Sequence, residues 1–211
     1  MFKIFMLYKN KRRFIIILCV ILIALLYAFK NYSFLIRALS IILSLWLFYF
    51  IDHAFGAEFH LRHYIYVISA LIFGILLSPL YWVSGIYDKV LHLFMPVLVS
   101  IIVFYLVDKL KIPFKWKLLL TLTSTIALIA SLEVIEYIAD IFWDMKLQGV
   151  YLRDISGLEK YDLILDRNDD TMIDIMLGFA GTIIFSISKY VCFFYKTKIK
   201  GSKKYKPKKK K

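Results

Sequence analysis

The feature that most constrains this chain is a series of long apolar segments. Of its 211 residues, 61% are apolar or aromatic and only 20% are charged. A helix that crosses a bilayer core of about 30 Å needs roughly 20 mostly apolar residues, because backbone polar groups in lipid must be satisfied within the segment. The pattern predicts an all-α integral membrane protein, a bundle of six transmembrane helices, and excludes a water-soluble globule. The six segments run approximately from Phe14 to Phe29, Phe34 to Gly56, Tyr64 to Trp82, Val90 to Val107, Leu118 to Trp143 and Thr171 to Tyr195.

The first apolar segment is expected to remain in the protein as a helix. Basic residues precede it, as they do in a signal peptide, but no small-residue cleavage pattern stands before Lys30, and a second apolar segment follows closely. We therefore expect residues 1–195 to form one polytopic membrane domain. Residues 196–211 contain ten lysines, and this segment is expected to be a disordered cytoplasmic tail.

The distribution of basic residues predicts the orientation in the membrane. An even number of spans puts both termini on the same side. The N-terminal segment, the turns at 57–63 and 109–117 and the tail together hold 20 lysine and arginine residues, whereas the opposite side holds six. By the positive-inside rule, both termini are cytoplasmic and the protein is a multi-pass protein of the cell membrane. The one long loop, residues 144–170, then lies outside the cytoplasm and is rich in acidic residues.

Ionisable side chains near or within the spans define the candidate site, since such groups are costly in lipid. On three of the expected helices they recur at helical spacing, so they share one face. A rise of about 1.5 Å per residue places the three faces at a common depth near the outer boundary. This pattern is typical of a site that binds a divalent metal ion or shares protons. The candidate metal ligands are Asp88, His92, Glu133, Glu136, Asp170 and Asp174, and the candidate catalytic residues are His92, Glu133 and Glu136.

Two acids on the last helix also fit a structural role. Thr171 followed by Asp174 matches a capping box, and Asp170 would be stabilised by the positive end of the same helix dipole. In that interpretation both acids start a helix and bind nothing. Glu133 is different, because it lies on an apolar run and would face lipid unless the bundle supplies a partner.

The remaining charged residues near the cluster have structural alternatives as well. Asp88 and Asp140 fit solvated positions at the membrane interface. Arg153 or Arg167 from the outer loop would neutralise the acids, and the cluster would then be a structural ion network.

A second polar group surrounds the short turn at 57–63. His60 and His63 have a spacing that metal ligands use, but juxtamembrane turns are commonly polar, so an ordinary turn is the favoured interpretation. The group comprises Asp52, His53, Glu58, His60, Arg62 and His63.

The bilayer and its headgroups are the expected partners. The lysine tail is drawn to anionic lipid headgroups by about 1 kcal/mol per charge near the surface. It has no aromatic interleaving, so no nucleic-acid binding is expected. Trp82, Trp116 and Trp143 lie near span ends, where aromatic residues anchor helices at the interface. Cys19 and Cys192 lie in apolar runs and give no disulfide framework.

Three motifs on successive helices resemble those of a known family. They are Tyr-Asp-Lys-Val-Leu-His at 87–92, Glu-Val-Ile-Glu-Tyr at 133–137, and Asp-Asp-Thr-Met-Ile-Asp at 169–174 with glycines at 178 and 181. This ordered set, over roughly half the chain, resembles the YjdF-type family of bacterial inner-membrane proteins and, more distantly, the VanZ-like family. The chain departs from the VanZ-like pattern at Glu136 and Tyr137, so no antibiotic-resistance role is transferred. The resemblance implies a polytopic membrane protein and supplies no reaction. Its matching positions are Asp88, His92, Glu133, Glu136, Asp170 and Asp174.

Three functions are compatible with these features. The leading hypothesis is a carboxylate and histidine pocket open to the extracytoplasmic side, with a divalent metal as the implied cofactor, acting on a lipid-linked or other envelope substrate. The second is an ion- or proton-coupled transporter, for which the middle of the spans offers few polar residues. The third is a non-catalytic structural or partner-binding membrane protein. Substrate, metal identity and oligomeric state are not encoded in any motif of the chain.

Overall fold

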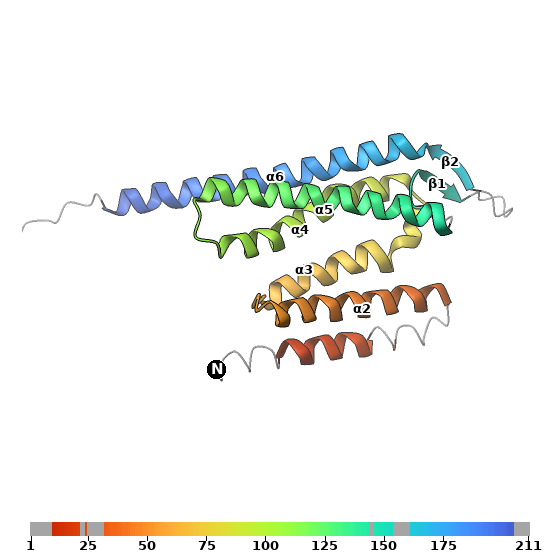
Figure 1. The fold of residues 1–211 in the computed structure, drawn as a ribbon, viewed down its shortest axis with the longest axis horizontal. Coiled ribbons are helices and arrows are strands. Elements are labelled where there is room, and N and C mark those ends of the chain that lie inside the picture. Colours follow the sequence, from red (N-terminus) through yellow and green to blue (C-terminus); the bar gives the residue numbers. More distant parts are fainter. Residues whose placement is uncertain (1–9, 22–23, 25–31, 144–145, 154–160, 205–211) are drawn as a thin grey trace, which may run out of the picture. The chain divides into compact units, whose positions relative to one another are not determined.

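A computed structural model describes residues 10–21, 24, 32–143, 146–153 and 161–204. The described chain is predominantly helical and forms two compact units (Figure 1). The first unit comprises Met1–Leu91 and Val150–Leu165, and the second comprises His92–Gly149 and Asp166–Lys211. Each unit is described by itself below.

The first unit packs an N-terminal helical segment, residues 10–21, with helices α2 (Tyr32–Ala54) and α3 (Leu61–Leu71). Ile41 and Leu45 of α2 are four residues apart, so they lie on one helix face. They are buried with Ile68 of α3, and Phe14 and Leu18 of the N-terminal segment pack against this core. The apolar face of α2 therefore joins the three helical segments.

The expected third span, Tyr64–Trp82, is not one regular helix. After α3 the chain makes a π-helical turn, Ile72–Leu76, and then a 3-10 helix, Ser78–Trp82. Pro79 has no N–H to continue the α-helical ladder. Ser78 Oγ donates a hydrogen bond to the carbonyl of Ile75 at 2.8 Å, which satisfies one of the last helical carbonyls. The continuous apolar helix is consequently the shorter stretch Leu61–Leu76.

The long loop at 144–170 contains a small sheet that the sequence did not predict. Strands β1 (Val150–Arg153) and β2 (Tyr161–Leu165) pair antiparallel, with an irregularity of register between Val150 and Tyr151. Val150 is buried against Gly85, where an added Cβ would lie 2.8 Å from Val150 Cγ1. The missing side chain of Gly85 thus allows strand β1 of the hairpin to pack closely against residue 85.

The second unit is built on three long helices, and the last two of them, α5 and α6, lie side by side (Figure 1). They are α4 (Gly85–Asp108), which belongs to this unit from His92 onward, α5 (Phe114–Trp143) and α6 (Arg167–Lys204). Gly178 of α6 lies against Ile129 of α5, and Gly181 lies against the backbone carbonyl of Leu93 on α4. Neighbouring helices therefore approach α6 closely at both glycines.

Four helices within the described residues are long and apolar enough to cross a membrane. They cover Arg37–Ala54, Gly85–Asp108, Phe114–Phe142 and Arg167–Ile199. Large apolar side chains such as Phe94, Ile135 and Met176 are exposed on these helices, as expected for surfaces that face lipid. The chain is therefore an all-α membrane protein apart from its small hairpin. The first expected span lies only partly within the described residues, and the total of six spans stays a prediction.

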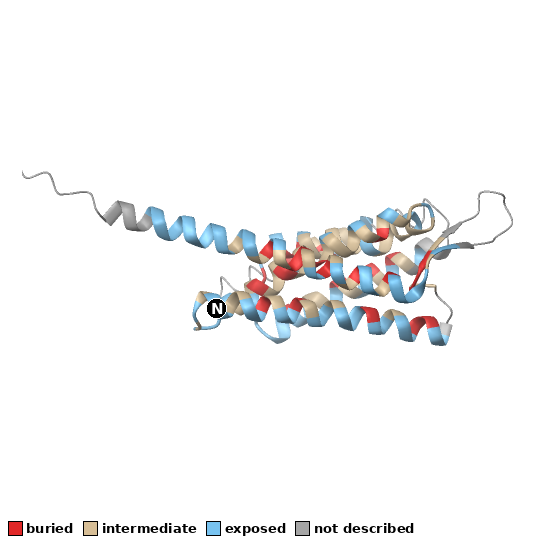
Figure 2. Cartoon of the chain, turned by 90° about the horizontal axis from the view of Figure 1, so that it is seen from above, coloured by how far each residue is buried: buried red, intermediate tan, exposed pale blue. Residues whose placement is uncertain are grey.

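Helix α6 continues beyond the expected end of the last span. It is helical as far as Lys204 and so includes part of the segment that was expected to be a disordered tail. Exposed residues predominate along this C-terminal portion (Figure 2). Residues 205–211 lie outside the described part of the chain.

Candidate functional site

A histidine of the second unit lies between two buried carboxylates from the two neighbouring helices. His92 Nδ1 is 3.7 Å from Glu133 Oε1 on α5, and His92 Nε2 is 3.8 Å from Asp174 Oδ2 on α6. The side chains of His92, Glu133 and Asp174 are 12%, 5% and 3% exposed, respectively. We refer to these three residues as the His92 cluster. Their predicted proximity, from three separate segments of sequence, is confirmed.

The spacing within the His92 cluster is informative. Both distances exceed the 2.7–3.2 Å range of an N–H···O hydrogen bond. Two ligands that each lie about 2.1 Å from one ion, at an angle near 120°, are separated by about 3.6 Å. The separation of His92 Nε2 from Asp174 Oδ2 therefore suits two ligands of one cation. Because the two nitrogens of one ring cannot bind the same ion, the Glu133 side of His92 serves a different purpose.

Asp88 extends the cluster along α4. It lies one helical turn before His92 on the same helix, so the two residues share one helix face. Lys89 Nζ lies 2.9 Å from Asp88 Oδ2 and offsets one negative charge. The residues present, two carboxylates and one imidazole, are suitable donors for a divalent ion of intermediate hardness.

Asp174 does not cap the helix on which it lies. Helix α6 begins at Arg167, and Asp166 is its cap, with Oδ1 accepting hydrogen bonds from the N–H groups of Asn168 at 2.9 Å and Asp169 at 3.0 Å. Asp174 is two turns into the helix and buried. The capping-box interpretation of Thr171 and Asp174 is wrong, because the helix starts one turn earlier than the hydropathy indicated. Asp174 thus has no capping function that explains its burial.

Asp140 and Asp170 organise the turn after α5. Asp140 accepts hydrogen bonds from the N–H groups of Leu147 at 2.8 Å and Gln148 at 3.0 Å. Asp170 Oδ2 accepts one from Gly149 N at 2.7 Å. Asp140 is therefore not a solvated interface residue, since it is buried and holds the backbone of the turn.

Two candidate ligands lie at the edge of this arrangement. Asp170 precedes Asp174 by one helical turn, and its carboxylate contacts the Gly149 backbone. Glu136 follows Glu133 by three residues on α5 and is partly buried. Among the described residues, the group of closely spaced ligand atoms around His92 does not include Glu133, Glu136 or Asp170.

Buried hydroxyl groups lie two helical turns below the His92 cluster. Ser100, Thr125 and Thr182 each stand eight residues from a cluster member on the same helix, a rise of about 12 Å. All three are fully buried, and Ser100 Oγ donates a hydrogen bond to Thr125 Oγ1 at 3.2 Å. Thr182 Oγ1 donates to the carbonyl of Gly178 at 2.8 Å, as hydroxyls in membrane helices commonly do.

Aromatic rings fill the unit beyond the hydroxyl groups. Phe104 of α4 lies 5.9 Å from Phe185 of α6 and 6.3 Å from Phe114 of α5, measured between ring centroids. Phe114 stacks on Phe193 at 4.0 Å. The interior of the second unit therefore changes from charged to hydroxyl-bearing to aromatic along its helices.

A second buried charge network, which sequence reasoning missed, lies in the first unit. Asp52 Oδ2 accepts hydrogen bonds from Lys11 Nζ at 2.6 Å and Tyr64 Oη at 2.7 Å, and its Oδ1 accepts one from Phe59 N at 2.9 Å. Lys11 and Asp52 are both buried. By sequence, Lys11 is one of the basic residues that indicate orientation, and no local pattern predicts that it pairs with a residue 41 positions away.

The histidines of this first-unit turn act locally. His63 Nδ1 accepts a hydrogen bond from His60 N at 3.0 Å and so closes the first turn of α3. Burial, the largest cause, and the nearby charges of Arg62, His60 and Lys11 together lower the pKa of His63 to about 4, although Asp52 acts in the opposite direction. His63 is thus a neutral structural residue at neutral pH.

These features define a class of protein. The chain is an all-α membrane protein with apolar helices and a group of acidic residues and a histidine buried among three of them. It belongs to the family described as "Predicted membrane protein (DUF2238)", whose family model matches residues 2–194. No curated protein and no solved structure matches the chain.

Proposed function

We propose that this protein is a multi-pass protein of the cell membrane whose His92 cluster binds a divalent metal ion and acts on a lipid-linked or other envelope substrate. The observation that carries the proposal is the position of His92 between two buried carboxylates from two other helices. Burying charged groups in a bilayer is costly, so their convergence favours a function over a purely structural role.

The two nitrogens of His92 have separate roles in this proposal. Asp88 and Asp174 are the metal ligands together with Nε2, the nitrogen that faces Asp174. Glu133 faces Nδ1 at 3.7 Å, and its proposed role is to favour this orientation of the ring through its charge, as carboxylates beside metal-bound histidines commonly do. A bound divalent ion would polarise a phosphoryl or carbonyl oxygen and lower the pKa of a bound water.

Glu136 and Asp170 are peripheral members of the proposed site. Glu136 lies one turn from Glu133 on α5 and is proposed as a proton acceptor. Asp170 keeps one carboxylate oxygen engaged with Gly149 N, and its proposed contribution is to hold the turn at the mouth of the site. Like Glu133, both residues lie outside the group of closely spaced ligand atoms around His92.

The orientation is also part of the proposal. We propose six spans with both termini in the cytoplasm, supported by the concentration of lysine and arginine on one side. The His92 cluster then opens toward the extracytoplasmic side. The YjdF-type and distantly VanZ-like character of residues 86–182 is compatible with this arrangement and is proposed on the same motifs.

A proton- or ion-coupled transporter is the second candidate. The Ser100 and Thr125 hydroxyls continue the polar interior beyond the His92 cluster and favour it. The contacts of Phe104 with Phe114 and Phe185 oppose it, because aromatic rings fill the route that an ion would take next. A third candidate, a structural protein whose lysine tail binds anionic lipid headgroups, does not account for the buried acids.

Metal binding by the purified protein tests the proposal. We expect wild-type protein in detergent to bind Mn²⁺ or Zn²⁺, and Asp174→Asn and His92→Ala to weaken that binding at least about tenfold, since loss of even a residue that only supports a ligand costs about 10–100-fold. Asp169→Asn is the matched control, since Asp169 is an exposed carboxylate on the same helix. Equal affinity in wild type, Asp174→Asn and Asp169→Asn would contradict the proposal.

Two further measurements separate the candidate functions. Cells that carry Asp174→Asn should accumulate an altered lipid or envelope precursor if the site is catalytic. Proteoliposomes loaded with a pH-sensitive dye should show proton flux that Ser100→Ala reduces if the protein is a transporter.

A further inference from the structure

The turn between α4 and α5 has an unusual sequence. Residues 109–117 read Lys-Leu-Lys-Ile-Pro-Phe-Lys-Trp-Lys, so lysines alternate with apolar or aromatic residues along most of the segment. Lys109, Lys111 and Lys115 are exposed. Leu110 and Trp116, between and beside them, are also exposed, Trp116 by 58%. Charged and apolar side chains are therefore presented together on the surface.

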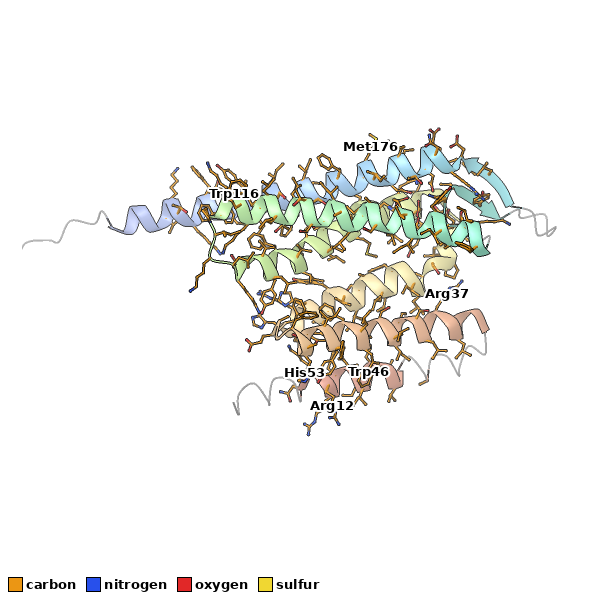
Figure 3. All side chains as sticks on the ribbon, viewed as in Figure 1. Arg12, Arg37, Trp46, His53, Trp116 and Met176 are labelled. Carbon is orange, nitrogen blue, oxygen red and sulfur yellow. The ribbon has the colours of Figure 1, made fainter. Side chains whose placement is uncertain are left out.

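This segment is held in place by contacts within the second unit. Phe114 stacks on Phe193 of α6, with ring centroids 4.0 Å apart. Lys117 Nζ donates hydrogen bonds to Asp108 O at 2.6 Å and Oδ1 at 2.9 Å. Lys109 Nζ lies 4.8 Å from the centroid of the Tyr105 ring. The turn thus has a defined structure on which Trp116 lies at the start of α5 (Figure 3).

The charge at this end of the unit is strongly positive. The turn contributes four lysines, and the exposed Lys196 and Lys198 follow Phe193 on α6. The one acidic residue in the turn and its flanks, Asp108, is engaged by Lys117. The turn therefore carries a clear excess of positive charge.

The position of the turn indicates what that surface is. It connects two helices that are long and apolar enough to span a membrane, Gly85–Asp108 and Phe114–Phe142, so it lies at a bilayer surface. There, apolar and aromatic side chains enter the boundary of the acyl chains, while lysine side chains extend toward the phosphates. Alternation of the two kinds of residue suits this interface better than it suits water.

We propose that residues 109–117, together with Lys196 and Lys198, form a binding site for the headgroups of anionic phospholipids. The lysine tail beyond α6 is not needed for it. This site is separate from the His92 cluster and does not depend on metal binding. From the sequence alone, we expect the lysine tail to bind anionic headgroups, whereas this proposal assigns such binding to a structured turn.

Trp116 provides a local probe for the test. The other three tryptophans, Trp46, Trp82 and Trp143, are replaced by phenylalanine. The protein is then reconstituted in two kinds of vesicle that both contain phosphatidylcholine and phosphatidylglycerol. In one kind the phosphatidylglycerol carries brominated acyl chains, and in the other the phosphatidylcholine does. We expect brominated phosphatidylglycerol to quench Trp116 more strongly than brominated phosphatidylcholine. The derived ratio of association constants should exceed about threefold, since one lysine at an anionic surface contributes up to about fivefold.

The triple variant Lys109→Gln, Lys111→Gln, Lys115→Gln should bring this ratio close to one. The matched control, Lys208→Gln, Lys209→Gln, Lys210→Gln, removes the same charge from the tail and should leave the ratio unchanged. Equal quenching by both lipids, or loss of the preference in the tail variant alone, would overturn the proposal. Lys117 is left intact, because it also binds Asp108.

A second readout needs no tryptophan replacement. The ratio of phosphatidylglycerol to phosphatidylcholine that co-purifies with the protein in mild detergent should fall in the turn variant and not in the tail variant. If an acidic peptide or single-stranded DNA abolishes the lipid preference at physiological salt, the turn recognises a soluble polyanion and the lipid assignment is wrong. Inorganic phosphate at the same ionic strength should have no specific effect.

Discussion

At the scale of single residues, the two units neutralise buried charge in different ways. Asp52 receives three hydrogen bonds, from an ammonium, a phenol and a backbone N–H. Removing one partner of such a pair leaves an uncompensated buried charge, so the network holds its segments together. The carboxylates around His92 are spaced more widely, at 3.7 and 3.8 Å. The first arrangement is a hydrogen-bonded structural network, whereas the carboxylates of the second lie beyond direct hydrogen-bond distance of the imidazole.

The histidine that closes the first turn of α3 makes stability depend on pH. His63 binds a proton with a pKa of about 4 in the folded protein, against about 6.5 in an unfolded chain. Between these values the unfolded state holds more protons, so the free energy of unfolding falls as the pH decreases through this window. The expected slope approaches about 1.4 kcal/mol per pH unit.

The thermal midpoint in detergent, measured between pH 7 and pH 4.5, checks this expectation. His63→Asn keeps a side-chain acceptor for His60 N and does not titrate, so its midpoint should vary less with pH than that of the wild type. His53→Asn is the control, because His53 is exposed on the neighbouring α2. An unchanged pH dependence in His63→Asn would show that other groups cause the acid sensitivity.

At the scale of elements, the packing of α4 against α6 depends on one glycine. An added Cβ at Gly181 would collide with the Leu93 carbonyl oxygen, a backbone atom that cannot rotate away. At Gly178 the nearest atom is Ile129 Cδ1, at 2.8 Å, which is the end of a flexible side chain. A larger side chain can therefore be accommodated at Gly178 more easily than at Gly181.

Replacing these glycines by alanine measures that difference. Both changes gain similar helix propensity, about 1 kcal/mol, so propensity cancels in the comparison. We expect Gly181→Ala to lower the thermal midpoint clearly, because overpacking costs about 1–3 kcal/mol, and Gly178→Ala to have a much smaller effect. Gly181→Ala should also weaken metal binding, since the Leu93 carbonyl that it would displace is adjacent to His92. Equal midpoints for the two variants would mean that α4 and α6 are not held by this contact.

At the scale of the whole molecule, composition explains the exposed surface. Large apolar side chains are exposed along the four spanning helices, and the buried face of each helix is narrow. In lipid such exposure carries no hydrophobic cost, so small and polar residues can occupy helix interfaces. Examples are Gly178 and Thr182 on α6, and the buried pair of Ser100 on α4 and Thr125 on α5.

Orientation is the prediction that belongs to this scale. In a background with Cys19→Ala and Cys192→Ala, a membrane-impermeant maleimide should label Ser156→Cys in intact cells. It should label Asn10→Cys and Ser202→Cys only after the membrane is permeabilised. Labelling of Ser202→Cys in intact cells would reverse the orientation, and different results for Asn10→Cys and Ser202→Cys would exclude an even number of spans.

Local information in the sequence was sufficient for the class of fold and for part of the candidate site. Apolar length predicts the long helices because the bilayer requires each span to satisfy its own backbone. Helical spacing, combined with depth along each helix, predicted that His92, Glu133 and Asp174 meet. The break after α3 was missed, because apolar composition does not register the missing N–H of Pro79.

Only the tertiary structure decided which charges serve which purpose. Asp140, Asp166, Asp170 and Asp174 are chemically the same, yet two hold a turn, one caps a helix and one faces a histidine. Likewise, Lys11 is a topogenic charge by sequence and the partner of Asp52 in the fold. The reason is physical: hydropathy and periodicity are properties of neighbouring residues, whereas the partner of a buried charge is set by helices that meet from distant parts of the chain.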